Sequence, residues 1–318
     1  MRLLIALGGN AIKQAHEAGT AEEQWLNCLL SMKHIAVVVS RMGPGDRLVI
    51  THGNGPQAGN LLVQQDAGKS AVPAQSMDIV GAMTQGQIGY MLQQTLQNCL
   101  AGLGLKVPVV AVVNQVLVNK DDREFLGDNA SKPVGNFFTE EQAKALKAEH
   151  PEYVVKKVKP NTKNGWRRTV PSPDPIGNVE QDAIRRMVES GIIVIASGGG
   201  GIPVIDDGGS LKGVEAVIDK DLAGERLAEV VKADTFMVLT DIDEVRLNYG
   251  KEGERGLRHM TVAEAKEYLG QGHFLAGSMG PKVMACIRFV EGGGQKALIT
   301  SLNKVLEAIE GQAGTEIS

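Results

Sequence analysis

Residues 3–10, LLIALGGN, decide the fold class of this chain, because five apolar residues run directly into two glycines and an asparagine. A short apolar run that ends at glycine is typical of a buried parallel strand feeding a tight turn. The pattern recurs at 47–57, RLVITHGNGPQ, where another apolar run meets glycine. We therefore expect an α/β protein whose strands end in glycine loops.

Helical and strand-like patterns alternate along the rest of the chain. Helical periodicity covers 20–42, 77–99, 180–189, 221–231, 261–269 and 281–292. Apolar and β-branched runs, typical of strands, cover 107–118, 192–196, 235–239 and 296–299. Repeated strand-then-helix order implies a mostly parallel central sheet covered by helices on both faces. Ligands of such sheets bind beyond the carboxyl ends of the strands, which is where the glycine loops fall.

Residues 121–175 differ in composition from the rest of the chain. Charges, prolines and aromatic residues are frequent there, and long apolar runs are few. The segment contains KPVG at 132–135 and a short helical pattern at 139–150, whose first residues TEEQ are typical of a capping box. We therefore expect an inserted subdomain, after which the regular alternation resumes.

Composition narrows the class of protein. A chain of 318 residues with 43% hydrophobic content can bury a large core, in one large α/β domain or two lobes. A net charge of -4, with both signs interspersed, provides no electrostatic footprint for nucleic acid or an anionic membrane. The chain enters a strand at once, without a signal-peptide pattern, and no apolar run reaches the roughly 18 residues of a membrane span. Three cysteines without CxxC spacing, Cys28, Cys99 and Cys286, favour free thiols in a reducing compartment, so we expect a cytoplasmic protein.

Four segments place glycine beside a polar or charged group, and a fifth, VIDKD, places a lysine between two aspartates. They are ALGGN at 6–10, THGNGPQ at 51–57, SGGGG at 197–201, VIDKD at 217–221 and GSMGPK at 277–282. The first alone is also what a simple tight turn would show, and none matches the dinucleotide or Walker fingerprints. Glycine lets a backbone approach an anion closely and point its N–H groups at it. Taken together, the five segments indicate a phosphoryl-transfer enzyme.

Two lysines in these segments are candidates to neutralise phosphate charge. Lys220 lies between two aspartates at a strand-to-helix junction, and flanking carboxylates orient a lysine and keep it charged. Lys282 begins a helix, where the dipole and free N–H groups favour an anion. We assign His52 no catalytic role, because a histidine at a strand end more often makes a local hydrogen bond. The other histidines are scattered, so no protein-built metal site is indicated.

The order of the motifs along the chain is specific. LGGNA (7–11), THGNGPQ (51–57), TQGQIGY (84–90), KPVG (132–135), VPSP (170–173), GGGGIP (198–203), DKDLA (219–223) and SMGPKV (278–283) span nearly the whole sequence. Together these residues resemble the carbamate kinases of the amino acid kinase superfamily. Departures from the expected family pattern are small. Thr84 stands where serine is expected and Ala58 where valine is expected. Ser131 stands where threonine is expected and Asn136 where proline is expected.

The resemblance implies a homodimer and an open αβα sandwich. It implies one amino-acid-kinase domain over 1–318, with a carbamate-binding lobe at 1–215, a protruding subdomain within it at about 121–175, and a nucleotide-binding lobe at 216–318. It also implies reversible phosphoryl exchange between ATP with carbamate and ADP with carbamoyl phosphate. Mg²⁺ would be carried on the nucleotide phosphates rather than by protein ligands, and ATP formation is the expected direction.

The resemblance also assigns roles to individual residues. The residues expected to hold carbamate and the transferring phosphoryl group are Gly8, Gly9, Asn10, Gly53 and Asn54. The expected catalytic residues are Lys220 and Lys282, which stabilise charge, Asp221, which holds both lysines, and Lys132, which reaches in from the subdomain. The residues expected near the nucleotide are Asp241, Tyr249, Met279, Gly280 and Lys282.

Two other functions stay open at this point. One keeps the superfamily and changes the acceptor to an acylated amino acid or a phosphate monoester, which should need a roomier site. The other is a non-catalytic sensor of carbamoyl phosphate or nucleotide, which the presence of all four charged site residues disfavours. The sequence leaves open whether the pathway is arginine or purine breakdown.

Overall fold

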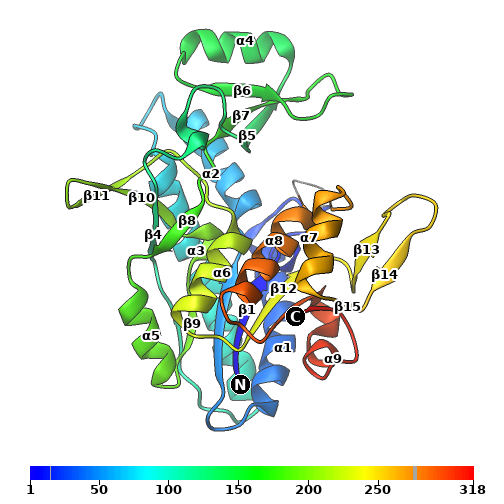
Figure 1. The fold of residues 1–318 in the computed structure, drawn as a ribbon. Coiled ribbons are helices and arrows are strands. Elements are labelled where there is room, and N and C mark those ends of the chain that lie inside the picture. The colour runs from blue at the N-terminus through cyan, green and yellow to red at the C-terminus, as the bar shows by residue number, and fades with distance from the viewer. Residues whose placement is uncertain (15, 275–277) are drawn as a thin grey trace.

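A central eight-stranded sheet organises the described part of the chain (Figure 1). The computed structural model describes residues 1–14, 16–274 and 278–318. The strand order is β15 (His259–Met260), β17 (Thr315–Ile317), β16 (Lys296–Ser301), β12 (Thr235–Thr240), β1 (Arg2–Leu7), β2 (Arg47–His52), β9 (Ile193–Ile195) and β3 (Val109–Ala111). Neighbouring strands run parallel except β16 and β17. The expected α/β fold with a mostly parallel central sheet is confirmed.

Alternating side chains of β1 supply both faces of the sheet. Leu3, Ile5 and Leu7 pack into one buried cluster, whereas Leu4 and Ala6 pack into another, because successive residues of a strand point to opposite faces. Helices α1 (Ala21–Arg41), α3 (Met77–Gly102) and α9 (Val305–Ile309) contribute to the first cluster. Helices α5 (Gln181–Glu189), α6 (Lys220–Val230), α7 (Val262–Gly270) and α8 (Met279–Glu291) contribute to the second. Burial of each large apolar side chain stabilises the fold by about 1.5–3 kcal/mol. Because helices cover both faces of the sheet, the architecture is a three-layer αβα sandwich.

The expected strand at 107–118 is wrong, because the chain leaves the central sheet in the middle of that segment. It forms β3 and then β4 (Gln115–Val118), which belongs to a separate four-stranded sheet ordered β11 (Ser210–Gly213), β10 (Ile202–Asp207), β4 and β8 (Pro175–Asn178). The break lies at Asn114, whose backbone N–H donates to the Gln85 side chain at 2.9 Å and whose carbonyl accepts from Ile202 at 3.1 Å. Side-chain hydrogen bonding here replaces the strand ladder.

A small subdomain stands apart from the sandwich at the top of Figure 1. It contains the three-stranded sheet β5 (Lys132–Phe138), β7 (Trp166–Val170) and β6 (Val154–Lys157), together with α4 (Glu140–Glu149). Thr139 caps α4 in a capping box with Gln142, as the sequence predicts. These elements lie inside the segment 121–175, while the division into lobes at 1–215 and 216–318 stays a prediction.

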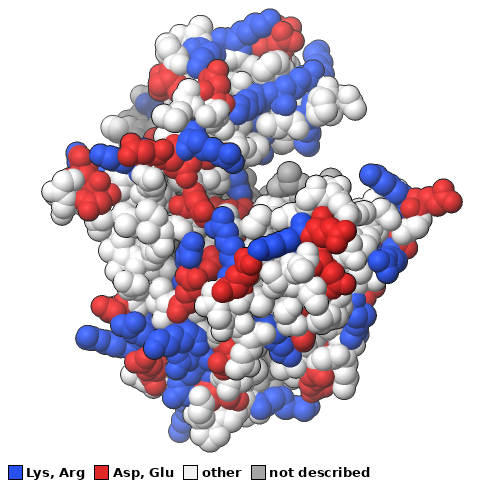
Figure 2. All heavy atoms as spheres, viewed as in Figure 1, with Lys and Arg blue, Asp and Glu red and all other residues white. Residues whose placement is uncertain are grey.

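Three further features complete the described chain. Helix α2 (Gly55–Gly68) follows β2, and a hairpin of β13 (Val245–Leu247) and β14 (Arg255–Leu257) extends beside α7 (Figure 1). Positive and negative side chains are mixed over the face seen in Figure 2. None of the helices in the described ranges combines the length and apolarity that a membrane crossing requires.

Helix α6 contains a second buried carboxylate, that of Glu225, in addition to Asp221. Glu225 is fully buried, and no residue in the described ranges donates a hydrogen bond to either carboxylate oxygen. The guanidinium Nε of Arg226 lies 3.7 Å from Oε2. Burial, only partly offset by Arg226, raises the pKa of Glu225 to about 8.

Replacing Glu225 by glutamine should flatten the pH dependence of stability. The unfolded side chain ionises near pH 4.3, so the stabilising effect of proton binding is complete below that value and is lost as pH rises through about 8. From about pH 6 to about pH 9, the wild-type free energy of unfolding should therefore fall relative to that of Glu225→Gln by on the order of 2 kcal/mol. Urea denaturation at both pH values measures the difference, with Glu252→Gln at an exposed position as control. Parallel curves for wild type and Glu225→Gln would contradict a protonated Glu225.

Candidate active site

Loops at the carboxyl ends of the parallel strands meet at one edge of the central sheet. The 3-10 turn η1 (Gly9–Ala11) follows β1, Gly53 follows β2, and the turn η3 (Gly198–Gly200) follows β9. A cavity of about 570 Å³ opens at this edge. The predicted site residues that line it are Gly8, Gly9, Lys220, Asp241 and Lys282. The structure thus brings together residues from both predicted lobes.

Two of the lining loops approach each other too closely for side chains. A Cβ atom on Gly8 would lie 2.8 Å from the carbonyl oxygen of Leu239, so this position requires glycine. Gly53 donates its backbone N–H to the Leu7 carbonyl at 3.1 Å, and a Cβ on Gly53 would lie 3.3 Å from Cδ of Lys220. The backbone of Gly53 therefore lies directly against the Lys220 side chain.

Asp221 joins the two predicted lysines. Its Oδ1 accepts from Nζ of Lys220 at 2.5 Å, and its Oδ2 accepts from Nζ of Lys282 at 3.0 Å. The side chains of Lys220, Lys282 and Asp221 are only 15%, 14% and 3% exposed. Lys220 and Asp221 begin α6, whereas Lys282 lies in the first turn of α8, so the pairing also fixes the two helix ends relative to each other.

The charges in this cluster do not balance. Burial would raise the pKa of Asp221, but the two lysines hold it below its usual value. Burial lowers the pKa of Lys220, an effect that Lys282 reinforces and Asp221 opposes. Burial also disfavours the charged form of Lys282, yet Asp221 outweighs it and raises the pKa of that lysine. Two cations sharing one carboxylate leave a net positive charge at the cavity, which favours an anionic ligand.

Lys132 reaches the site indirectly. Its Nζ donates to Oδ2 of Asp219 at 3.0 Å, and Oδ1 of Asp219 accepts from the backbone N–H of Asp221 at 2.9 Å as the N-cap of α6. Lys132, from β5 in the subdomain, is therefore linked to the Asp221 cluster through Asp219. It does not line the cavity in this structure.

The four-glycine loop packs against the end of β2. Ser197, Gly199, Gly200 and Gly201 all have positive φ values, of 52°, 67°, 98° and 85°. A Cβ on Gly198 would lie 2.3 Å from Nε2 of His52, and one on Gly199 would lie 2.1 Å from Nδ2 of Asn54. The run of glycines is thus required by both backbone conformation and close approach.

His52 is a neutral structural group. Its ring is fully buried, and Nδ1 lies 2.9 Å from the Gly53 carbonyl, to which it donates. Burial, with a further contribution from the positive charge of Lys220, lowers the pKa of His52 to about 4. A histidine with this pKa stays uncharged at neutral pH, in keeping with the local hydrogen bond expected from the sequence.

The residues expected near the nucleotide occupy an adjoining cavity of about 150 Å³. Asp241, Tyr249 and Met279 line it, and Thr240, Asp241 and Ser278 are shared with the larger cavity. Gly280 is buried in the first turn of α8. The Asn10 side chain lies outside what the structure describes, as does Gly277 of the GSMGPK motif.

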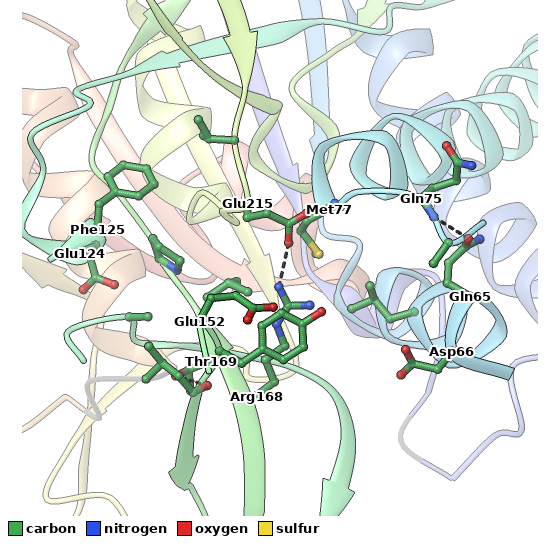
Figure 3. Close-up of a pocket in the computed structure, with 18 of the residues that line it drawn as sticks. Gln65, Asp66, Gln75, Met77, Glu124, Phe125, Glu152, Arg168, Thr169 and Glu215 are labelled. Carbon is green, nitrogen blue, oxygen red and sulfur yellow. Dashed lines mark hydrogen bonds and ion pairs between the residues drawn. The ribbon is translucent and has the colours of Figure 1, made fainter. Parts of the chain in front are cut away.

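A separate cavity, of about 650 Å³, lies between the subdomain and the sandwich, away from the glycine loops (Figure 3). Arg168 of β7 points into it, with its guanidinium 3.8 Å from the centre of the Tyr153 ring and a 2.8 Å bond to Glu215. Glu215 also accepts from the backbone N–H of Met77 at 2.8 Å. Through Glu215, Arg168 therefore ties the subdomain to the first residue of α3.

Sequence reasoning missed a buried polar network behind the glycine loop. The amide of Asn114 accepts from the Ser197 backbone at 2.6 Å and donates to Asn178 at 2.9 Å, while Gln85 donates to the Gly198 carbonyl at 3.1 Å. A polar run within an otherwise apolar helix, TQGQ at 84–87, is the signal that could have indicated it.

Alanine at Gly199 should destabilise the protein more than alanine at Gly208. Both glycines have φ near 67°, at 67° and 66°, so both variants incur the left-handed backbone penalty of about 1–3 kcal/mol. Only Gly199→Ala also meets the Asn54 amide, whereas a Cβ on Gly208 would have no atom of the described residues within 4 Å. Urea denaturation of the two variants measures the difference, and equal midpoints would show that the Gly199–Asn54 contact is not tight.

Comparison with known proteins gives the relationship of the chain. The model of the amino acid kinase family matches residues 1–301. The chain is 53% identical to a carbamate kinase of Pyrococcus horikoshii, covering 100% of this chain and 99% of the relative. It is 55% identical to a carbamate kinase of Thermococcus kodakarensis, covering 99% and 98%. Its structure matches that of carbamate kinase from Giardia lamblia bound to AMP-PNP, with a TM-score of 0.92, 39% identity and coverage of 99% and 98%. The chain therefore belongs to the amino acid kinase family and, within it, to the carbamate kinases, which are phosphotransferases.

Proposed function

We propose that this chain transfers a phosphoryl group reversibly between ATP and carbamate, giving ADP and carbamoyl phosphate, and that ATP formation is the direction used. The observation that carries the proposal is the net positive Lys220–Asp221–Lys282 cluster beside the glycine loops. Phosphoryl transfer passes through a loose transition state with charge spread over the phosphoryl oxygens. Positioning and charge stabilisation therefore account for most of the catalysis.

The two lysines stabilise the transferring group from two sides in this mechanism. Asp221 fixes both Nζ atoms before substrate arrives, so little reorganisation is required during the reaction. Gly8, Gly9 and Asn10 approach the group from β1, and Gly53 and Asn54 approach it from β2. Backbone N–H groups of such loops bind anions without adding a titratable group.

No general base is needed on the acceptor side. Carbamate carries its own anionic oxygen, so the nucleophile requires no deprotonation. The neutral, buried His52 is in keeping with this, because its pKa of about 4 leaves it a poor proton acceptor. Lys132, from the subdomain, pairs with Asp219 and so offsets the negative charge of that carboxylate beside the lysine cluster.

The nucleotide binds, in this proposal, beside Asp241, Tyr249, Met279, Gly280 and Lys282. The structural relative that carries AMP-PNP, an ATP analogue, supports a nucleotide site in this fold. Among the described residues no three His, Cys, Asp or Glu side chains converge on a point. Mg²⁺ on nucleotide phosphates commonly takes one or two protein carboxylates as well, so the donor chemistry fits. Asp241, at the junction of the two cavities, would supply one such carboxylate, which departs from the expectation that no protein ligand takes part. When bound, Mg²⁺ neutralises charge on the nucleotide phosphates.

Alanine at Lys220 tests the proposal directly. Lys220→Ala should lower turnover in ATP formation from ADP and carbamoyl phosphate by roughly 10²-fold or more, the scale for losing one strong electrostatic stabiliser. A coupled assay of ATP formation with Mg²⁺ measures it. Lys212→Ala is the matched control, because Lys212 is 62% exposed and pairs with Asp207 on the β10–β11 hairpin.

The outcomes separate the alternatives. Normal turnover by Lys220→Ala would remove the lysine from the mechanism. Wild-type protein that binds carbamoyl phosphate without turnover would point to a sensor, and protein with neither binding nor turnover would point to a different acceptor.

We also propose that the chain forms a homodimer through α3. This helix of 26 residues contains a single charged side chain, Asp78. Nevertheless it exposes Ile79, Met83 and Tyr90, at 41%, 39% and 58%, along one face of helical spacing. Depletion of charge around exposed apolar and aromatic side chains is typical of an interface core, and a second copy presents the same face for a two-fold contact.

Glutamate at Met83 and Tyr90 should convert the dimer to monomers. Four buried carboxylates, two from each copy, would face one another in the interface, and their desolvation and repulsion oppose association. Light scattering after size exclusion should then report the monomer mass of 33.8 kDa instead of twice that value. Leu211→Glu, at a 45% exposed position on β11, should leave the mass unchanged. A dimeric double variant would place the interface elsewhere.

We place the protein in a reducing compartment, the cytoplasm. Cys28, Cys99 and Cys286 are all free thiols, and Cys28 and Cys286 are buried in the core. Unpaired, buried cysteines are typical of proteins that never meet an oxidising environment.

A further inference from the structure

The side-chain amide of Asn54 is held between a backbone and a hydroxyl group. Its flat face lies against Gly199, where a Cβ atom would be within 2.7 Å of Nδ2, Cγ and Oδ1. Its Nδ2 lies 2.9 Å from Oγ1 of Thr84 in α3. The plane of the amide is therefore set by Gly199, and the remaining question is which end carries the oxygen.

Thr84 answers that question through its own hydrogen bond. Oγ1 of Thr84 lies 2.7 Å from the carbonyl oxygen of Gly81. Two oxygens at this distance need a proton between them, and only the hydroxyl can supply it. The single Thr84 proton is thus committed to Gly81, so Oγ1 must accept from Asn54. Thr84 is fully buried, which excludes water as a competing partner.

This assignment directs Oδ1 of Asn54 away from Thr84 as an unused acceptor. Among the described residues none donates a hydrogen bond to it. Asn54 is half-buried and directly follows Gly53, whose backbone lies against Lys220. The residue that carries this acceptor oxygen therefore adjoins Gly53, which lies against a lysine of the cluster that attracts an anion.

The chemistry of the proposed substrate matches this acceptor. Carbamoyl phosphate and acetyl phosphate have nearly the same shape and differ in an amino group against a methyl group. An acceptor oxygen stabilises the amino group through its N–H, whereas a methyl group leaves that oxygen unpaired. A flipped amide would instead place its own NH₂ against the substrate's NH₂.

We infer that Thr84 is a positioning residue for acceptor selectivity: it fixes Asn54 so that Oδ1 accepts from the amino group of carbamate and carbamoyl phosphate. The inference rests on the proposed phosphoryl transfer and adds to it the group that distinguishes carbamoyl from acetyl. Thr84 does not touch substrate and acts only through the Asn54 amide.

The test is the selectivity ratio, kcat/KM for carbamoyl phosphate divided by kcat/KM for acetyl phosphate, in ATP formation from ADP. Thr84→Val removes the hydroxyl at nearly constant volume and lets the amide flip. The ratio should fall about 10-fold, the scale of one hydrogen bond, mainly through a higher KM for carbamoyl phosphate. The KM for ADP and the rate with acetyl phosphate should stay unchanged. Thr84→Ser keeps the hydroxyl and should keep the wild-type ratio.

Two variants separate selectivity from stability. Thr95→Val removes another buried hydroxyl from α3, which donates to the Met91 carbonyl at 2.6 Å, and should leave the ratio unchanged. Thr84→Ala, with the best helix-forming residue, repeats the test should valine fail to fold. A folded Thr84→Val or Thr84→Ala protein with the wild-type ratio overturns the inference while the proposed function stands. A wild-type protein that transfers from neither phosphate overturns the proposed function itself.

Discussion

The shared carboxylate of Asp221 is the interaction on which the active edge depends. Two lysines with side chains about 15% exposed would repel each other and be costly to desolvate without it. Asp221 and Asp219 together supply two carboxylates against the three cations Lys132, Lys220 and Lys282, so one positive charge stays uncompensated. The cluster is therefore stable enough to be built in advance, and it still requires an anion to complete its electrostatics.

The backbone around Asp221 is arranged to keep this cluster in place. Asp219 caps the first turn of α6 and also receives Lys132 from the subdomain, so one short segment holds three cationic groups. The α6 and α8 helices pack against the same core cluster as Leu4 and Ala6 of β1. Rigid burial of these helices is what makes the positions of Lys220 and Lys282 definite before a ligand binds.

The sequence predicted the central features of the fold because they depend on local pattern. The apolar run 3–7, the recurring glycine turns and the Thr139 capping box each appear where expected. The strand expected at 107–118 was wrong because its division depends on Asn114, whose partner Gln85 lies 29 residues away in the chain. Lys132 shows what the sequence could not predict. Its side chain is positively charged, but whether it lines the cavity or pairs with Asp219 depends on the position of the subdomain relative to the sandwich.

The two sides of the site differ in physical character, and this difference fits phosphoryl transfer to a small neutral-ended acid. On the phosphoryl side, full charges act at short range, where they gain most from a partly dry environment. On the side proposed for the acceptor, the described groups are amides, hydroxyls and glycine backbone: Asn54, Thr84, Gly199 and the Asn114–Ser197 network behind them. His52, a titratable group in that region, is buried and its pKa is lowered to about 4, so it adds no charge at neutral pH to compete with the lysines. Neutral groups can select between an amino and a methyl group without disturbing the positive field that the transferring phosphoryl group requires, and for this reason the proposed selection and transfer can occupy neighbouring loops of one sheet edge.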